Sequence, residues 1–320
     1  MKRIKDDAAC RVASTGWPHP RSVVGSPGRG TASVIGVLLE VSMVSTLFRL
    51  SAAAALVLAS TAVHAACTPA ITDGNLIAPG KLQLSINPTN PPQQFVDKDG
   101  QLQGLNVELA AELGKRLCLP VELVRMDFPA MIPALGAARI DGVNTGMFWT
   151  EERSKLMYMV PYAIQAISVV VSPDSGTKIA TENDLIGKSS AVEVSSYQMN
   201  WLKKLSDASV AKGGAAVEMR TFPTATNVVS ALLAGQVDNA LLVDSVARDL
   251  VGRGRVKEVL SGLGTARTTL GFRNKTVADT VVKALNAMRA DGSYQALFDK
   301  FGLTSMPADQ PLAIAGPGPA

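Results

Sequence analysis

The chain has 320 residues, 47% of them hydrophobic, which suffices to bury two cores of ordinary domain size and excludes a disordered bulk. Its formal net charge of +4 comes from the first 65 residues, with seven Lys or Arg and three Asp or Glu, because residues 66–320 hold 24 of each. A neutral body gives no case for binding nucleic acid or an anionic membrane.

Residues 43–65 carry the pattern of a secretory signal peptide. Its parts are a start methionine, a positive flank, a short apolar core and small residues for cleavage: Met43, Arg49, residues 50–59 and residues 63–65. The Arg-, Gly- and Pro-rich residues 1–42 ahead of it are then a misplaced translation start or a disordered leader. We therefore predict export to the periplasm and a mature chain that begins at or near Ala66 or Cys67.

Two cysteines remain in the expected mature chain, Cys67 and Cys118, because Cys10 lies ahead of the signal peptide. An even pair in an exported protein favours a disulfide, which would join the amino-terminal segment to the end of the first helix. The alternative leaves Cys118 buried and Cys67 free or carrying a lipid anchor. Against the lipid anchor, His64 stands three residues before Cys67, where lipoprotein signals usually have leucine.

Strand and helix patterns alternate in the first half of the mature chain. The expected elements are a strand at 82–86, a loop at 87–92, a hairpin at 95–102, a helix at 105–117, a strand at 121–124, a helix at 129–138 and a strand at 140–145. In the helix at 105–117, leucine recurs at every fourth position and charged residues stand off that line. Such alternation implies an α/β fold with a mostly parallel sheet flanked by helices.

The stretch Gly142–Arg153 concentrates groups that suit a small zwitterion. Gly146 lets a ligand approach the backbone, and two aromatic residues and a helix cap follow it. The guanidinium of Arg153 can bind a carboxylate through two parallel hydrogen bonds. The competing interpretation is a strand, a turn and a surface arginine that pairs with Glu151 or Glu152.

Residues 160–172 have no helical period and are rich in β-formers, so we predict an extended segment that crosses between two lobes. A second run follows, with strands at 189–194, 217–222 and 237–243 and helices at 197–205 and 226–234. Residues 134–141 align without gaps with residues 231–238, which indicates that each half sends a helix into a similarly placed strand. The last expected elements are a returning strand at 268–272 and helices at 277–288 and 294–301.

Residues 126–135 and 146–153, followed by 160–162 and 167–171, resemble the extracytoplasmic solute-binding proteins of polar amino acid ABC importers, often called solute-binding family 3. The resemblance runs from about residue 81 to residue 303. It implies a two-lobed periplasmic-binding fold, each lobe a mostly parallel sheet flanked by helices, joined by two hinge crossings. The implied function is capture of a small amino-acid-like solute with a carboxylate and its delivery to an ABC transporter permease. We expect a monomer that binds no nucleic acid, cofactor or metal.

The predicted domain boundaries combine this resemblance with the composition of the chain ends. They are 1–42 leader, 43–65 signal peptide, 66–165 first part of lobe 1, 166–172 hinge crossing, 173–265 lobe 2, 266–272 return crossing, 273–304 helices that pack on lobe 1, and 305–320 disordered tail. The tail is expected to be loose because residues 306–320 include four prolines.

The resemblance implies ligand-binding roles only at positions that match the family pattern. Arg153 matches the arginine that grips the ligand's α-carboxylate, Gly146 matches a backbone contact, and Phe128 matches an aromatic residue that packs on the ligand. Phe148 stands where members often have a small hydroxyl residue, which implies a more apolar pocket. Asp244 matches the carboxylate that accepts from the ligand's ammonium, in an alignment that needs one extra residue before it.

Other expected ligand residues depart from the family pattern. In family members, a glycine precedes a helix amino terminus whose free N–H groups attract a carboxylate. Here Ser195 stands in place of that glycine, and Ser196 and Tyr197 follow it. The alternative is that Ser196 only caps the helix and contacts no ligand. Asn87 stands where many members have an aspartate for the ammonium, and Asn90 where they have an aromatic residue. An amino acid derivative, an amide-rich ligand or another polar metabolite therefore stays open beside a standard α-amino acid.

An enzyme is the first alternative function, since a few periplasmic dehydratases resemble these binding proteins and Glu193 and Asp244 are candidate acids. The only histidines, His19 and His64, lie outside the expected mature chain, and the sequence has no Cys/His metal cluster, nucleophile elbow or phosphate loop. No catalytic residue is therefore assigned. A ligand-sensing module is the second alternative, which we expect to continue into a membrane span and signalling domains.

Overall fold

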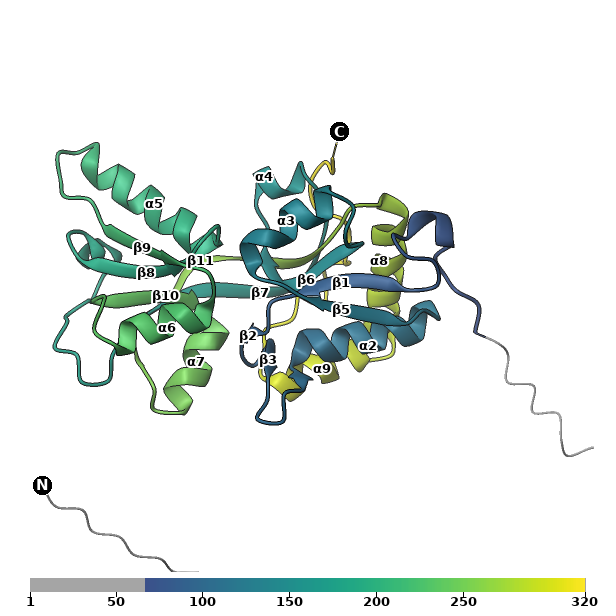
Figure 1. Cartoon of the computed structure of the whole chain (residues 1–320), viewed down its shortest axis with the longest axis horizontal. Coiled ribbons are helices and arrows are strands. Elements are labelled where there is room, and N and C mark those ends of the chain that lie inside the picture. The colour runs from purple at the N-terminus through teal and green to yellow at the C-terminus, as the bar shows by residue number, and fades with distance from the viewer. Residues whose placement is uncertain (1–66, 320) are drawn as a thin grey trace, which may run out of the picture. The chain divides into compact units, whose positions relative to one another are not determined.

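The computed structural model describes residues 67–319, which form an α/β fold of two lobes built on one mixed β-sheet (Figure 1). The predicted leader at 1–42 and signal peptide at 43–65 lie outside the described residues. Between residues 67 and 319, no helix has the length and apolar character needed to cross a membrane.

The main sheet has eight strands in the order β5 (Val121–Arg125), β1 (Leu82–Ile86), β6 (Gly142–Phe148), β11 (Lys257–Phe272), β7 (Tyr158–Val171), β10 (Asn239–Val243), β8 (Ser189–Glu193) and β9 (Glu218–Phe222). Strands β5, β1 and β6 are parallel and belong to lobe 1, whereas β10, β8 and β9 are parallel and belong to lobe 2. Strands β7 and β11 run antiparallel to each other between the two groups. The predicted α/β fold is confirmed: each lobe has a mostly parallel sheet, and two crossings join the lobes.

The crossings expected at residues 166–172 and 266–272 are the ends of two longer strands, β7 and β11, which pair along their length. Their ladder shifts register several times in the part of β11 before Ala266, where Gly262 and Gly264 adopt positive φ. Register shifts of this kind bend a strand pair locally. The two crossings therefore form one irregular ribbon between the lobes.

The helices flank the sheet, and four of the eight described helices follow a residue whose side chain caps them. They are α2 (Leu105–Leu117), α3 (Phe128–Gly136), α4 (Glu151–Ser154), α5 (Tyr197–Val210), α6 (Ala225–Leu233), α7 (Asp244–Gly252), α8 (Lys275–Ala290) and α9 (Ser293–Phe301), with short 3₁₀ turns η1 (Asp73–Asn75) and η2 (Glu182–Leu185). Side-chain oxygens of Thr150, Ser196, Thr224 and Asn274 accept backbone N–H groups at the starts of α4, α5, α6 and α8.

A small antiparallel sheet of β2 (Thr89–Asn90), β3 (Gln94–Val96) and β4 (Leu102–Gln103) contains the predicted hairpin. Helix α7 and the first half of β11 were not predicted.

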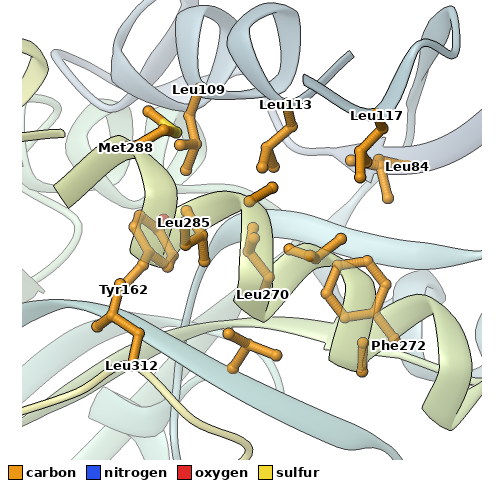
Figure 2. Close-up of a cluster of buried hydrophobic side chains, with 14 of the residues drawn as sticks. Leu84, Leu109, Leu113, Leu117, Tyr162, Leu270, Phe272, Leu285, Met288 and Leu312 are labelled. Atoms are coloured by element: carbon orange, nitrogen blue, oxygen red, sulfur yellow. The ribbon is translucent and has the colours of Figure 1, made fainter. Parts of the chain in front are cut away.

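The leucine stripe of α2 is buried in the core of lobe 1, as the sequence predicted. Figure 2 shows Leu109, Leu113 and Leu117 on one side of the cluster, opposite residues of α8 and β11. In the same cluster, the Tyr162 hydroxyl donates to the Asn106 side chain at 2.6 Å, which satisfies the buried phenol. Lobe 1 thus takes its core from segments near both ends of the described chain.

Lobe 2 has an apolar cluster on each face of its part of the sheet. One cluster packs under α6 and α7 and includes Val228, Leu232 and Val246. The other packs under α5 and includes Leu202 and Leu185. Each lobe therefore has a core of its own, which allows one lobe to move relative to the other without disrupting either core.

The carboxyl-terminal segment differs from the disordered tail expected at 305–320, because residues 305–319 pack on lobe 1. Met306 and Leu312 are buried in the lobe 1 core, and the Asn286 side chain of α8 bonds both backbone groups of Leu312. Farther along, Ala315 N–H donates to the Met159 carbonyl at 2.8 Å. Prolines disfavour a regular helix here, and pairing with β7 is limited to isolated bridges at Ser305 and Ala315, but apolar side chains of the segment are still buried.

We expect Leu312→Ala to lower the free energy of unfolding by at least about 2 kcal/mol, because it removes a buried side chain and leaves a cavity. Urea unfolding measures this change. Asp309→Ala, at an exposed position of the same segment, is the matched control and is expected to stay within about 0.5 kcal/mol of the unaltered protein. Equal stability of all three proteins would contradict the packing of this segment.

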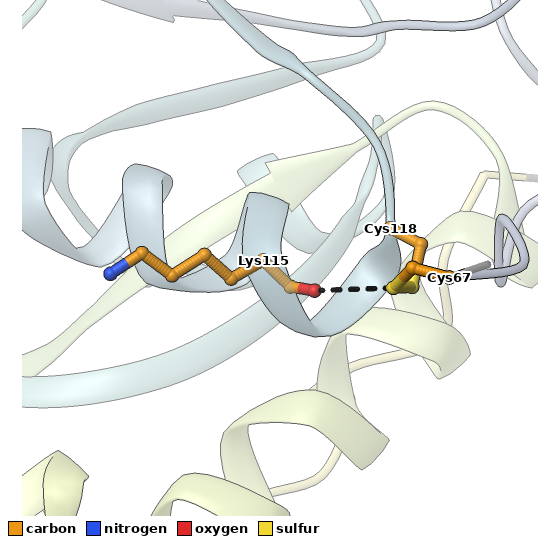
Figure 3. Close-up of a disulfide and its surroundings, with 3 residues drawn as sticks. All are labelled: Cys67, Lys115 and Cys118. Atoms are coloured by element: carbon orange, nitrogen blue, oxygen red, sulfur yellow. Dashed lines mark hydrogen bonds between the residues drawn. A yellow bond between two sulfur atoms is a disulfide. The ribbon is translucent and has the colours of Figure 1, made fainter. Parts of the chain in front are cut away.

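A disulfide joins Cys67 to Cys118, with a Cα–Cα distance of 5.4 Å (Figure 3). Cys118 ends α2 with a φ of 54°, and this left-handed turn brings it beside the amino-terminal segment. The 4.0 Å approach of Cys67 Sγ to the Lys115 carbonyl is a contact only, since a disulfide sulfur has no proton to donate. The bond closes a segment of 51 residues that includes β1 and α2.

Candidate functional site

A small cavity lies between the lobes, beyond the carboxyl ends of β6 in lobe 1 and of β8 and β10 in lobe 2. Open α/β sheets bind ligands at this end of their parallel strands. Of the expected ligand residues, these line the cavity: Arg153, Gly146, Phe128, Phe148, Ser196, Tyr197 and Asn90. Its volume is about 30 Å³, enough for a water molecule but not for an amino acid. Asn87 and Asp244 are not among the lining residues.

Arg153 is buried in the cavity wall, with only 6% of its surface exposed. Its guanidinium donates to the Phe148 carbonyl at 2.8 Å and, across the cleft, to the Ser195 carbonyl at 2.9 Å. It also lies 5.3 Å from the centre of the Phe128 ring, a distance at which a cation attracts the ring face. No carboxylate among residues 67–319 lies within 4.0 Å of it, and Glu151 pairs with Lys155. The interpretation of Arg153 as a paired surface residue is therefore wrong.

Burial lowers the pKa of the Arg153 guanidinium to about 10, while the charge of Glu152 acts in the opposite direction. The side chain therefore keeps its positive charge at neutral pH. Its two carbonyl partners are neutral and use only part of its five N–H donors. A buried cation with neutral partners attracts an anion into the cleft.

Gly146 gives β6 a turn that brings its backbone close to the cavity. Its φ is 69°, a conformation that other residues rarely adopt, and a Cβ atom there would collide with the side-chain oxygen of Gln93. Gln93 in turn donates to the Ser245 hydroxyl of lobe 2 at 3.0 Å. The glycine is therefore needed both for the turn and for a contact between the lobes.

Glu193 ends β8 and faces the cavity from lobe 2. Its Oε1 accepts from the Asn87 side chain of lobe 1 at 2.9 Å, and its Oε2 has no hydrogen-bond partner among the described residues. Burial raises the pKa of the Glu193 carboxyl to about 8; the hydrogen bond from Asn87 opposes this shift and the charge of Asp127 adds to it. The sequence suggested Glu193 only as a catalytic acid, although its place at the end of a predicted strand indicated a position in the cleft.

The start of α5 forms the lobe 2 wall next to Arg153. The Ser196 hydroxyl accepts Met199 N–H at 3.0 Å, so it caps the helix and also lines the cavity. Ser195 adopts a φ of 61°, the left-handed conformation that favours glycine, at the position where family members have a glycine. The Tyr197 ring stacks on Phe148 across the cleft, with centres 4.5 Å apart and planes 12° apart. This aromatic pair closes one side of the cavity.

Asn87 and Asp244 are bonded to other protein groups. Asn87 donates to Glu193 and accepts the Thr89 hydroxyl, so its amide orients the glutamate. Asp244 begins α7, where one carboxylate oxygen accepts Ser245 N–H and the other pairs with Arg248 at 3.0 Å. The structure thus leaves Asp244 outside the cavity wall, where Val243 takes its place.

Direct contacts join the lobes around the cavity. They are the hydrogen bonds Asn87–Glu193, Gln93–Ser245 and Arg153–Ser195 and the stacked pair Phe148–Tyr197. These contacts, together with the small cavity, describe lobes that are closed on each other. Within residues 67–319, no group of three or more His, Cys, Asp or Glu residues could hold a metal ion.

Comparison with known proteins gives consistent matches over this region. Residues 82–304 match the family model of bacterial extracellular solute-binding proteins, family 3. The chain is 29% identical over 228 residues to the L-cystine-binding protein TcyJ of Escherichia coli, covering 69% of this chain and 82% of that protein. It is 28% identical over 242 residues to the histidine-binding periplasmic protein of Salmonella typhimurium, covering 70% and 88%.

Solved structures of similar proteins share the fold. An ancestral arginine-binding protein bound to arginine aligns with a TM-score of 0.65 and 30% identity, covering 69% of this chain and 98% of that one. An ancestral amino-acid-binding protein, AncCDT-1, described as a precursor of cyclohexadienyl dehydratase, aligns with a TM-score of 0.61 and 25% identity, covering 69% and 95%.

Proposed function

Because the chain belongs to the bacterial extracellular solute-binding proteins of family 3, we propose that it is the substrate-binding component of an ABC importer and takes up an amino acid or a derivative with a carboxylate. The single observation that carries the ligand class is Arg153, a buried arginine in the cleft wall with only neutral partners. A ligand carboxylate would supply its counter-charge.

The ligand class also agrees with the similar proteins. TcyJ is named for L-cystine, the Salmonella relative for histidine and the ancestral protein for arginine, which are all α-amino acids. This chain would hold the ligand carboxylate with Arg153 and with backbone groups near Gly146, and its hydrocarbon part against Phe128 and Phe148. Three aromatic rings around the cavity favour a ligand with an apolar or planar side chain.

Capture would proceed by opening and closing of the lobes. A cavity of about 30 Å³ admits no amino acid, so the ligand has to enter a more open form. The irregular β7–β11 ribbon can absorb this motion, since each lobe has its own core. The closed protein would then deliver the ligand to a membrane permease.

The location would be the periplasm, in agreement with the family and with the disulfide, which persists in oxidising compartments. The disulfide also disfavours a lipid anchor at Cys67. Its sulfur is bonded to Cys118 and has no thiol left for a thioether.

A second candidate is an enzyme of the dehydratase type, as AncCDT-1 is a precursor of one. One observation favours it: burial raises the pKa of Glu193 to about 8, so the carboxyl can act as a general acid at neutral pH. Product formation during incubation with amino acids and cyclic carboxylic acids would distinguish catalysis from binding.

A ligand panel tests the proposal. We expect at least one of the twenty standard L-amino acids or L-cystine to raise the midpoint of thermal unfolding, because a ligand at 100 times its Kd adds about 2.7 kcal/mol to the stability. Small-angle scattering is expected to show a smaller radius with that amino acid than without it. Absence of binding across the panel, with no small molecule co-purifying in native mass spectrometry, would contradict the proposed function.

A further inference from the structure

We infer that Glu193, and not Asp244, receives the ammonium group of the bound ligand. The inference rests on the proposed function and assigns a second residue of the same site. It starts from the two ionisable side chains of opposite sign in the cavity wall, Arg153 from lobe 1 and Glu193 from lobe 2. Neither has a charged partner among the described residues, since no ion pair within 4.0 Å includes them.

The hydrogen bonds of Glu193 leave half of its carboxylate available. Asn87 binds Oε1 at 2.9 Å, while Oε2 has no partner among residues 67–319. The Asn87 carbonyl oxygen already accepts from Thr89, so the amide can only present its N–H to the glutamate. Asn87 is therefore a positioning residue that fixes Glu193 toward the cleft. An ammonium group has three donors and would complete the hydrogen bonds of Oε2.

Both carboxylate oxygens of Asp244 already have a hydrogen-bond partner within α7. One of its oxygens accepts Ser245 N–H at 2.9 Å and the other pairs with Arg248 at 3.0 Å. It also lies at the first turn of α7, outside the residues that line the cavity. A ligand ammonium at Asp244 would compete with the Arg248 ion pair and would lie outside the cavity wall, whereas at Glu193 it would meet an oxygen with no hydrogen-bond partner among the described residues.

Charge neutrality of the closed cleft supports the same assignment. With a zwitterionic ligand, the carboxylate pairs with Arg153 and the ammonium with Glu193, so that no charge is left uncompensated. The other ionisable groups near Glu193 are Asp127, which precedes α3, and Tyr197 of α5. Neither is cationic, and the charge of Arg153, which lines the same cavity, is not among the causes that shift the pKa of Glu193, so a ligand ammonium would supply the positive charge that ionises Glu193.

A ligand ammonium that reaches Glu193 in the closed form should release a proton. In this closed arrangement burial raises the pKa of Glu193 to about 8, so the carboxyl is largely protonated at pH 7 until the ammonium arrives. An adjacent ammonium favours the charged carboxylate and lowers this pKa, so the proton leaves as the ligand enters. Calorimetry in buffers of different ionisation enthalpy measures that release at pH 7.

The test compares Glu193→Gln, Asp244→Asn and a matched control on lobe 2, Glu218→Gln, whose carboxylate pairs with Arg220 at the surface. The probes are the amino acids of the panel and, for each binder, the acid that lacks only its amino group. We expect Glu193→Gln to weaken amino acid binding by roughly tenfold to a hundredfold and to abolish proton release. Asp244→Asn and Glu218→Gln should stay within about threefold. The acid without the amino group should bind Glu193→Gln no more weakly than it binds the unaltered protein.

Two different failures are distinguishable. If an amino acid binds and Arg153→Ala abolishes the binding, but Asp244→Asn weakens it and Glu193→Gln does not, the inference is overturned while the proposed function stands. If no amino acid binds the unaltered protein, the proposed function fails and the inference fails with it. Thermal unfolding of each variant without ligand checks that Glu193→Gln, which keeps an acceptor for Asn87, is folded.

Discussion

Arg153→Ala is expected to weaken ligand binding by roughly 30-fold to several thousand-fold. Removal of the guanidinium leaves the ligand carboxylate desolvated in a closed cleft without its counter-charge, which costs about 2–5 kcal/mol, and about 1.4 kcal/mol corresponds to tenfold in Kd. Titration calorimetry with any amino acid that binds the unaltered protein measures the loss. The large effect follows from burial, since Arg153 is 6% exposed.

Arg153→Lys should restore only part of the affinity. A lysine keeps the charge but cannot donate to Phe148, to Ser195 and to a carboxylate in the planar geometry of a guanidinium. Arg139→Ala removes an arginine from an exposed position of lobe 1 and is the matched control, with binding expected to be unchanged. Equal affinities of Arg153→Ala and the unaltered protein would exclude Arg153 from the site, and most of the case for a carboxylate ligand would be lost.

Loss of the Cys67–Cys118 disulfide should have the largest effect on stability. The bond closes a segment of 51 residues, and the entropy of the open unfolded chain then predicts a loss of about 4 kcal/mol, within a usual range of about 2–5 kcal/mol. Urea unfolding of the variant with both cysteines changed to serine measures this loss. The midpoint should fall, with little change in ligand affinity, because the disulfide lies away from the residues that line the cleft.

Reduction provides the control for this second prediction. With a strong reductant, the unaltered protein should become as unstable as the double serine variant, while the variant itself should not respond. A double variant as stable as the oxidised protein would show that the bond contributes nothing to folding.

Local sequence patterns predicted the elements that are set by nearby residues. The leucine repeat of α2 placed that helix and its buried face correctly, and the alternation of strands and helices gave the two lobes. The first half of β11 has no comparable signal, because its glycines Gly262 and Gly264 interrupt the pattern and its pairing partner is the distant β7. Residues 305–319 were missed for a similar reason, since the burial of Leu312 depends on the surface that α8 offers.

The same distinction between local patterns and distant contacts applies to the residues of the candidate site. Gly146 and Arg153 belong to one continuous stretch, so the sequence alone placed them together in the cleft wall. Glu193 and Gln93 come from different lobes, and their positions depend on how the lobes meet. Asp244 was assigned by its match to the family pattern, which gives no information about its pairing with Arg248.

The discontinuity of lobe 1 has a consequence for the order in which the exported protein can fold. Lobe 2 comes from one uninterrupted segment between β7 and β11, whereas Lys300 of α9 binds Glu108 of α2, which is 192 residues earlier. The chain of the exported protein proposed above emerges amino end first. Lobe 2 can therefore be completed while the leucine face of α2 still waits for α8 and Leu312. A chaperone that protects the emerging chain would be needed longest at α2, the first helix of the fold to emerge.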